Sequence, residues 1–232
     1  MKTKIFCDSA DFQTIKELND NPLVSGFTTN PSLMRLSGAK NYKKYSLKIL
    51  KICKKKPISL EVFGDTFDEM LRQALIINSW GKNVYVKIPV VNSKGLYSGK
   101  VIKALSQKGV NLNITAVYTV NQVKKILKSI SNNSKTIISI FSGRMSDVGK
   151  DPVPIIKKSI QLTKKLKKVE ILWASTREAY NYLQAKNYGC PIITMPPSII
   201  EKISKFGKTH QELTIDTVKK FLKDSKKSNF KL

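Results

Sequence analysis

The sequence predicts a single (β/α)8 barrel, the TIM-barrel fold, over residues 1–232. Short runs rich in β-branched residues alternate with longer amphipathic runs, and each strand-plus-helix unit spans roughly 20 to 35 residues. The competing doubly wound sheet needs a glycine-rich first turn for a dinucleotide, whereas the first turn here reads Asp8-Ser9-Ala10-Asp11. A barrel is therefore the better prediction.

The first half of the chain supplies four of the expected strands. Each is a short apolar or β-branched run bounded by turn residues, at positions 4–8, 24–28, 58–62 and 84–90. The helices between them are predicted from apolar residues at helical spacing, at 11–19, 42–54 and 66–80, the last with Asp65 or Thr66 as its N-cap. Residues 29–41 are expected to form a polar turn with no helix.

The second half repeats the alternation. Strands are predicted at 111–115, 136–141, 169–174 and 191–195. Helices are predicted at 95–107, 120–129, 151–167, 177–186 and 198–205, where Asp151 and Pro152 suit a first helical turn. An additional helix is expected at about 214–223, followed by a flexible tail over 224–232.

Lys87 is the most unusual residue of a predicted strand, because its neighbours in 84–90 are apolar, β-branched or aromatic. A strand of this composition is covered on both faces, so Lys87 enters a packed layer. Burying an ammonium group costs several kcal/mol unless the group is paired or loses its proton. A deprotonated lysine is a nucleophile that forms Schiff bases. The alternative is a structural lysine at the barrel rim, paired with a carboxylate.

The formal net charge is +26, from 42 basic and 16 acidic residues, and only Arg35, Arg72, Arg144 and Arg177 are arginines. We interpret the scattered lysines as a solvated surface, because no nucleic-acid motif accompanies them and contact with nucleic acid would be non-specific. Three separated cysteines and the single His210 support neither a disulfide framework nor a metal site. Neither a long apolar run nor a signal-peptide pattern is present, so a cytoplasmic protein is expected.

Polar residues collect where the predicted strands end, which is where (β/α)8 barrels hold their chemistry. Any one of them has an ordinary structural explanation, such as a helix cap, a turn or an ion pair. Their coincidence at one end of one barrel favours a functional site. The set comprises Asp8, the run Thr28-Thr29-Asn30-Pro31-Ser32, Glu61, Lys87, Asn113, Thr115, Ser139, Phe141, Arg144, Ser175 and Arg177.

These motifs, in this order, resemble the transaldolase family over nearly the whole chain. The resemblance is carried by the runs Thr28-Thr29-Asn30-Pro31-Ser32, Val86-Lys87-Ile88-Pro89, Asn113-Ile114-Thr115, Ser139-Ile140-Phe141-Ser142-Gly143-Arg144 and Ala174-Ser175-Thr176-Arg177. The length is similar to that of the short-chain branch, which includes the fructose-6-phosphate aldolases.

The resemblance implies a class I mechanism without metal or cofactor, in the pentose phosphate pathway. Lys87 would form a Schiff base with a ketose phosphate, fructose 6-phosphate or sedoheptulose 7-phosphate, and Asp8 would move the proton of its C4 hydroxyl. Glu61, through a water held with Thr115, would serve formation and dehydration of the carbinolamine. The implied substrate-binding residues are Asn30 and Asn113 for the dihydroxyacetone unit, Ser139, Arg144, Ser175 and Arg177 for the phosphate, and also Thr29 and Phe141.

Two positions distinguish the branches of this family. Free aldolases carry glutamine at the position of Glu61 and tyrosine at that of Phe141, so this chain resembles the transferases. Departures from the family pattern are Trp173, Ile140 and Thr176. The alternatives are a free fructose-6-phosphate aldolase and an inactive barrel that binds polyanions. The relatives also imply a homo-oligomer, a pentamer or decamer, in which the C-terminal helix packs on a neighbour.

Overall fold

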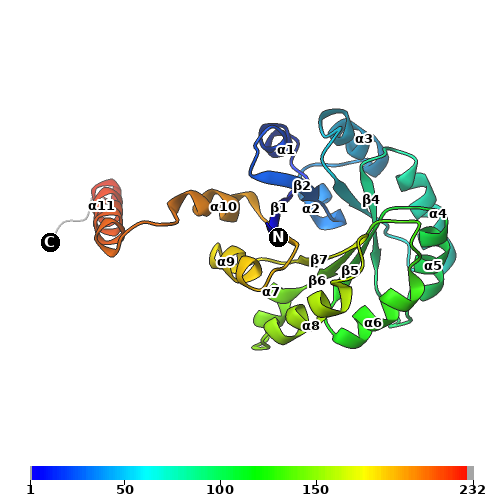
Figure 1. Cartoon of the computed structure of the whole chain (residues 1–232). Coiled ribbons are helices and arrows are strands. Elements are labelled where there is room, and N and C mark those ends of the chain that lie inside the picture. Colours follow the sequence, from blue (N-terminus) through cyan, green and yellow to red (C-terminus); the bar gives the residue numbers. More distant parts are fainter. Residues whose placement is uncertain (1, 229–232) are drawn as a thin grey trace.

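The computed structural model describes residues 2–228 and forms a closed barrel of parallel strands in chain order, with β1 paired to β8 (Figure 1). The predicted fold is therefore confirmed. The strands are β1 (Lys4–Asp8), β2 (Val24–Thr28), β3 (Ile58–Glu61), β4 (Val84–Pro89), β5 (Leu112–Val117), β6 (Thr136–Ile140), β7 (Val169–Trp173) and β8 (Ile192–Met195).

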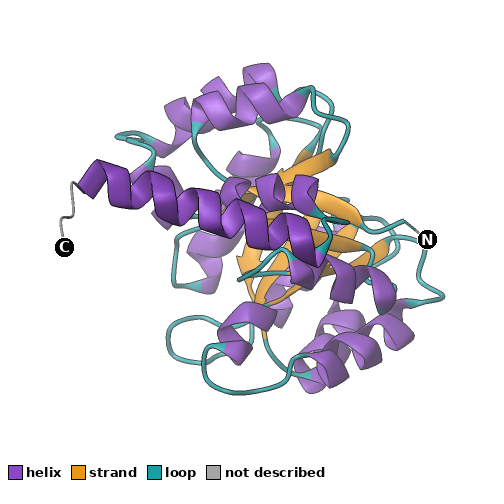
Figure 2. Ribbon diagram, turned by 90° about the vertical axis from the view of Figure 1, so that its left-hand side faces the viewer, coloured by secondary structure: helices purple, strands orange, loops and turns teal. Residues whose placement is uncertain are grey.

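Helices surround the barrel, as the purple ribbons around the orange strands of Figure 2 show. The helices up to β6 are α1 (Phe12–Asn19), α2 (Pro31–Leu36), α3 (Tyr42–Ile52), α4 (Phe67–Asn78), α5 (Gly99–Gln107) and α6 (Val120–Ser129). After β6 come α7 (Ser142–Ser146), α8 (Val153–Thr163), α9 (Tyr180–Asn187), α10 (Pro197–Ile200), the short 3-10 helix η1 (Glu201–Lys205) and α11 (His210–Ser228).

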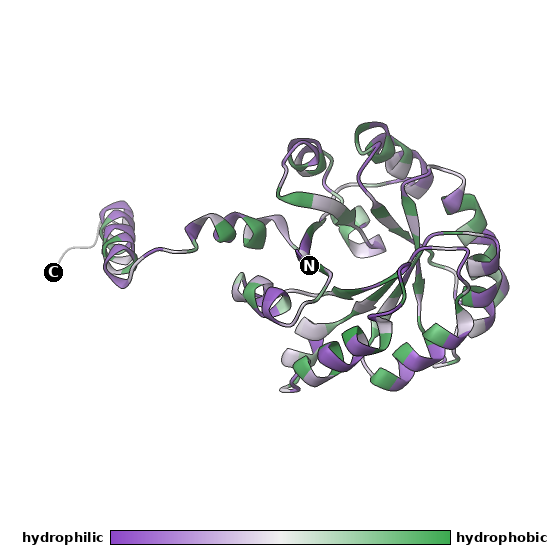
Figure 3. Ribbon diagram, in the orientation of Figure 1, coloured by the Kyte–Doolittle hydropathy of each residue, from purple (hydrophilic) through white to green (hydrophobic). Residues whose placement is uncertain are grey.

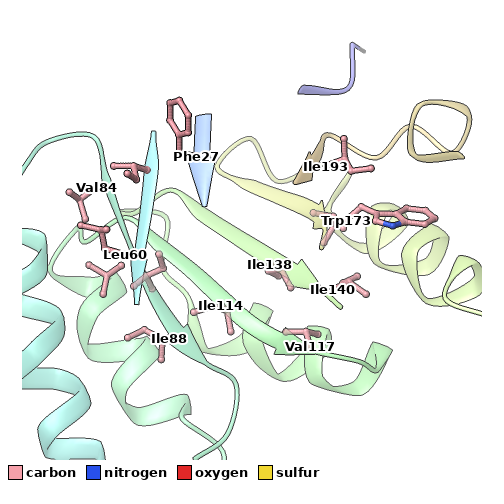
Figure 4. Packing of buried hydrophobic residues seen from close by; sticks show 14 of the residues in the cluster. Phe27, Leu60, Val84, Ile88, Ile114, Val117, Ile138, Ile140, Trp173 and Ile193 are labelled. Carbon is pink, nitrogen blue, oxygen red and sulfur yellow. The ribbon is translucent and has the colours of Figure 1, made fainter. Parts of the chain in front are cut away.

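The main core lies between the strands and the covering helices. Outward-facing strand residues such as Ile88, Ile114 and Ile138 are fully buried there (Figure 4). The covering helices carry both hydrophobic and hydrophilic residues (Figure 3), which is the amphipathic pattern that predicted them. The barrel interior is a smaller apolar layer that includes Phe6 and Leu172. Because both faces of every strand are buried, the strand sequences are dominated by Val and Ile.

The expected polar turn over 29–41 is wrong in part, because it contains α2. Pro31 occupies the first turn of α2, and the Asn30 side chain accepts a hydrogen bond from the Leu33 N–H at 2.9 Å. The structure also adds the one-turn helix α7, which lies within the expected connection between β6 and 151. Helix α5 starts at Gly99 and not at Gly95, whose φ of +77° belongs to a turn. Helices as short as α2 and α7 have too few residues to show the helical period of apolar residues in the sequence.

Helix α11 is longer than expected and lies apart from the barrel at the left of Figure 1. Its N-terminus is capped by Thr209, whose hydroxyl accepts from the Glu212 N–H, and neither glycine nor proline interrupts it before Ser228. Residues 224–228 of the expected flexible tail are therefore helical, and 229–232 lie outside the described residues. No residue of α11 is buried. Within residues 2–228, no helix combines the length and the apolarity needed to span a membrane.

Candidate active site

A cavity of about 220 Å³ opens at the C-terminal ends of the strands. Nine of the residues that the sequence analysis singled out line it, namely Asp8, Thr28, Asn30, Lys87, Ser139, Phe141, Arg144, Ser175 and Arg177. Barrel closure brings these residues together although they span most of the chain. A larger hollow, of about 710 Å³, lies outside the barrel around α3, and four of its eight lining residues are lysines. No strand-end residue contributes to it, so the smaller cavity is the candidate active site.

Lys87 lies on β4 with its side chain inside the barrel, and the residue is only 6% exposed. Its Nζ is 3.2 Å from Glu61 Oε2 and donates a hydrogen bond to the Thr29 carbonyl oxygen at 3.0 Å. Glu61 and Lys87 are paired in register on neighbouring strands, which explains their contact. The pairing fits the structural alternative for Lys87. That alternative leaves unexplained why the lysine also faces a polar cavity.

Asp8 also lines the cavity. Its carboxylate accepts a hydrogen bond from the Thr28 hydroxyl, and the Thr28 hydroxyl in turn contacts the Thr194 hydroxyl. Thr28 Oγ1 donates to Asp8 Oδ1 at 2.7 Å, so the 2.6 Å contact between the Thr28 and Thr194 hydroxyls requires Thr194 as donor. Burial raises the pKa of the Asp8 carboxyl, although the nearby Lys87 and the Thr28 hydrogen bond oppose that rise. A carboxyl whose proton affinity is increased in this way is suited to proton transfer.

A second hydrogen-bonded set fixes the floor of the site. Asn113 Nδ2 donates to Ser59 Oγ at 2.9 Å, and Ser139 Oγ donates to Asn113 Oδ1 at 2.7 Å. These contacts fix the orientation of the Asn113 amide, which is fully buried. Asn113 is also paired in register with Lys87, so its amide lies in the strand layer of the lysine.

Thr29 and Thr115 have different surroundings from the cavity-lining set. The Thr29 hydroxyl donates to the Ser59 carbonyl at 2.9 Å and is buried, so Thr29 faces Lys87 through its backbone carbonyl. Thr115 is buried on β5, and its hydroxyl has no hydrogen-bond partner within residues 2–228. A buried hydroxyl without a protein partner is a group that an ordered water commonly satisfies.

The opposite side of the cavity carries two arginines, and a close contact between two backbone segments determines their positions. Gly143, the second residue of α7, lies against the Ser175 carbonyl, and a Cβ at Gly143 would lie 1.6 Å from that oxygen. Ser175 itself has a φ of +60°, a left-handed conformation that is uncommon for residues other than glycine. Together these features bring Arg144, after Gly143, and Arg177, after Ser175, to the same side of the site. The Arg144 guanidinium lies 5.6 Å from the ring centroid of Phe141.

Several residues that support this site escaped the sequence analysis. Thr194 supports Asp8, Ser59 supports Asn113, and the Tyr42 hydroxyl bonds the backbone of Glu61 through both its N–H and its carbonyl at 2.9 Å. Asp147 forms an ion pair with Arg177. The only sequence signal was a polar residue inside an apolar run, as at Ser59 and Thr194, and that signal does not identify the partner.

Comparisons with known proteins agree with the geometry. The sequence profile of the family described as "Transaldolase/Fructose-6-phosphate aldolase" matches residues 5–232. A protein of Thermoplasma volcanium named "Probable transaldolase" is 37% identical over 227 residues, covering 97% of this chain and 96% of that protein. One of Nitrosopumilus maritimus with the same name is 34% identical over 226 residues, covering 97% and 95%.

Similarity to solved structures concerns the fold alone. The crystal structure of dihydrodipicolinate synthase from Thermotoga maritima superposes with a TM-score of 0.61 at 13% sequence identity. The match covers 87% of this chain and 72% of that one. At this identity the two chains share a barrel, and nothing follows about their substrates.

The raised pKa of Asp8 predicts a stability gain on neutralising it. The folded protein holds this proton more tightly than the unfolded chain, so the contribution to stability is full below the unfolded pKa, 3.8, and is lost as pH rises through the folded value. Asp8→Asn keeps the acceptor for Thr28 without the charge. It should raise the free energy of unfolding at pH 7, measured by urea denaturation.

The difference in free energy of unfolding between Asp8→Asn and the unaltered chain should shrink as pH falls toward 4. Asp11→Asn is the matched control, because a hydrogen bond from Thr14 lowers the pKa of Asp11 and its neutralisation should give no gain. If Asp8→Asn were less stable than the unaltered chain, by a free-energy difference that does not change with pH, burial would not be what raises the pKa of Asp8.

Proposed function

Because the chain belongs to the transaldolase/fructose-6-phosphate aldolase family, we propose that it is a transaldolase acting in the pentose phosphate pathway. It would move a dihydroxyacetone unit from a ketose phosphate, such as fructose 6-phosphate or sedoheptulose 7-phosphate, to an aldose phosphate. The observation that carries this proposal is Lys87, a 6% exposed lysine that faces a polar cavity shared with Asp8.

Lys87 is the proposed nucleophile. Its neutral amine attacks the ketone carbon, and loss of water from the carbinolamine gives an iminium. Glu61, 3.2 Å from Lys87 Nζ, is placed to exchange protons in these steps, with the free Thr115 hydroxyl as the holder of a water. The iminium supplies the electron sink, so the proposed reaction needs no metal or cofactor.

Asp8 is the proposed base for carbon–carbon cleavage. It takes the proton from the C4 hydroxyl, the C3–C4 bond breaks, and its electron pair moves into the iminium to give an enamine on Lys87. From fructose 6-phosphate the aldehyde that leaves is glyceraldehyde 3-phosphate. The enamine then attacks the carbonyl carbon of the acceptor, erythrose 4-phosphate, Asp8 returns the proton, and hydrolysis releases the new ketose phosphate.

Binding is assigned to the remaining polar groups. The Asn30 and Asn113 amides are proposed to hold the hydroxyls of the dihydroxyacetone unit. Arg144 and Arg177 are proposed to hold the phosphate with Ser139 and Ser175, because a guanidinium grips phosphate through two N–H groups at once. This assignment gives a reason for two arginines in a chain whose basic residues are nearly all lysine.

A coupled assay tests the activity. Fructose 6-phosphate should yield glyceraldehyde 3-phosphate only when erythrose 4-phosphate is present, and borohydride with the donor should leave a covalent adduct on the Lys87 peptide. Lys87→Met should lower turnover at least about a thousandfold with the fold kept. Lys56→Met is the control, since Lys56 contacts the Leu18 and Asn21 carbonyls outside the cavity. Normal turnover in Lys87→Met would remove Lys87 from the mechanism.

Phe141 is the residue that favours transfer over free aldol cleavage. It lines the cavity, and its ring lies edge-on to Tyr118 with centroids 5.9 Å apart. An apolar ring at this position would shield the enamine from protonation by water. The alternative, a fructose-6-phosphate aldolase, would release free dihydroxyacetone without any acceptor.

Phe141→Tyr should therefore raise release of free dihydroxyacetone relative to transfer by at least about tenfold, because it adds a proton-conducting hydroxyl. Both products are followed in the same assay, with Phe206→Tyr, away from the cavity, as the matched control. An unchanged product ratio would show that Phe141 does not shield the intermediate.

Helix α11 supports the further proposal of a homo-oligomer, a pentamer or decamer. Its apolar residues are between 43% and 66% exposed, namely Leu213, Ile215, Val218, Phe221 and Leu222. A helix with such a face is stable when another surface covers it, and a second copy would do so.

The double variant Val218→Glu and Phe221→Glu should lower the molar mass in solution to that of a single chain, because it places charges on the covered face. Light scattering measures the mass, and Lys219→Gln with Lys220→Gln, which changes the net charge by the same amount, is the control. An unchanged oligomer would exclude this face of α11 from the interface.

A further inference from the structure

We propose that Asp147 is a positioning residue that orients the Arg177 guanidinium for the phosphate group of the substrate. The inference rests on the proposed function, because it assigns a role within the same phosphate site. Asp147 follows α7, and Arg177 lies in the connection after β7, so the two come from different units of the barrel.

The contacts between the two side chains occupy one edge of the guanidinium. Arg177 Nε donates to Asp147 Oδ1 at 2.9 Å and to Oδ2 at 3.2 Å, and Nη2 donates to Oδ2. Nη1 donates to the Ser175 carbonyl at 3.1 Å. A guanidinium has five N–H groups, so one remains on Nη1 and one on Nη2. These two N–H groups are left to donate to phosphate oxygens.

The backbone fixes this arrangement from both sides. The Asp147 N–H donates to the Gly143 carbonyl at 2.9 Å, which ends α7 and sets the position of Asp147. Gly143 in turn lies against the Ser175 carbonyl, where no larger residue fits. The Arg177 N–H donates to Asn181 Oδ1 at 3.1 Å. The carboxylate and the guanidinium therefore meet because the α7 turn and the β7 connection are packed together.

A carboxylate beside a phosphate site also repels the ligand, so two effects oppose each other. The Asp147 and Arg177 side chains are 46% and 47% exposed, and charge effects are strongly screened at such positions. Arginine has many rotamers, and holding one of them in advance removes an ordering cost from binding. We therefore expect the orienting effect to outweigh the repulsion. The other arginine, Arg144, lies over the Phe141 ring and forms no salt bridge within residues 2–228, although its charge also helps to lower the pKa of Asp147.

Asp147→Ala in the full chain tests the proposal, with Glu178→Ala as matched control. Glu178 is exposed and follows Arg177 directly, but its carboxylate makes no contact with Arg177 within the described residues. Two quantities are measured: the KM and kcat with fructose 6-phosphate, and the Kd of inorganic phosphate by calorimetry. Asp147→Ala should raise KM and Kd roughly tenfold, which corresponds to ~1.4 kcal/mol, while kcat changes less than twofold.

Asp147→Asn, which keeps one acceptor for Arg177, should fall between the unaltered chain and Asp147→Ala. Phosphate binding by Asp147→Ala as tight as that of the unaltered chain, or tighter, would overturn the proposal, and so would an equal loss in Glu178→Ala. Absence of phosphate binding by the unaltered chain together with an unchanged KM would also overturn it. Phosphate binding without turnover of fructose 6-phosphate would reject the proposed function, and the Kd values would still decide the role of Asp147.

Discussion

The structure of the site depends on one constraint, which is that the Lys87 amino group lies inside the barrel and needs polar neighbours there. Glu61 and the Thr29 carbonyl contact it directly, and Asp8 contributes an opposite charge nearby. Each of these groups is itself held: the backbone of Glu61 by Tyr42, Thr29 by Ser59, and Asp8 by Thr28. A buried network whose polar groups lack some of their hydrogen-bond partners would be less stable than an apolar core. Each of these supporting hydrogen bonds therefore matters for the position of Lys87.

The same burial that requires these contacts also sets the chemical character of the site. Removing water raises the proton affinity of Asp8, whereas the ion pair of Lys87 with Glu61 places an acid beside the amine. One carboxylate is thus held by hydroxyls and the other by an amine. Two acids in such different surroundings suit two different proton transfers, which is the division of work that a Schiff-base mechanism requires.

The fold could be predicted from the sequence because strand burial leaves a local trace. Short runs of apolar and β-branched residues identified all eight strands, and a closed parallel barrel buries both of their faces. Short elements left no such trace. The helices α2 and α7 were missed because five or six residues cannot display a helical period, and the end of α11 was misplaced because its polar last turns look like a tail.

The sequence by itself determined which strand ends carry ionisable side chains, since Asp8, Lys87, Arg144 and Arg177 are recognisable from their neighbours along the chain. Only the tertiary structure decided which groups meet. Thr194 reaches Thr28 because β8 closes on β1, and Asp147 reaches Arg177 because Gly143 allows α7 to lie against Ser175. The reason is physical: a residue type reports its local environment, whereas a hydrogen bond between distant segments depends on barrel closure and loop packing, which local sequence does not encode.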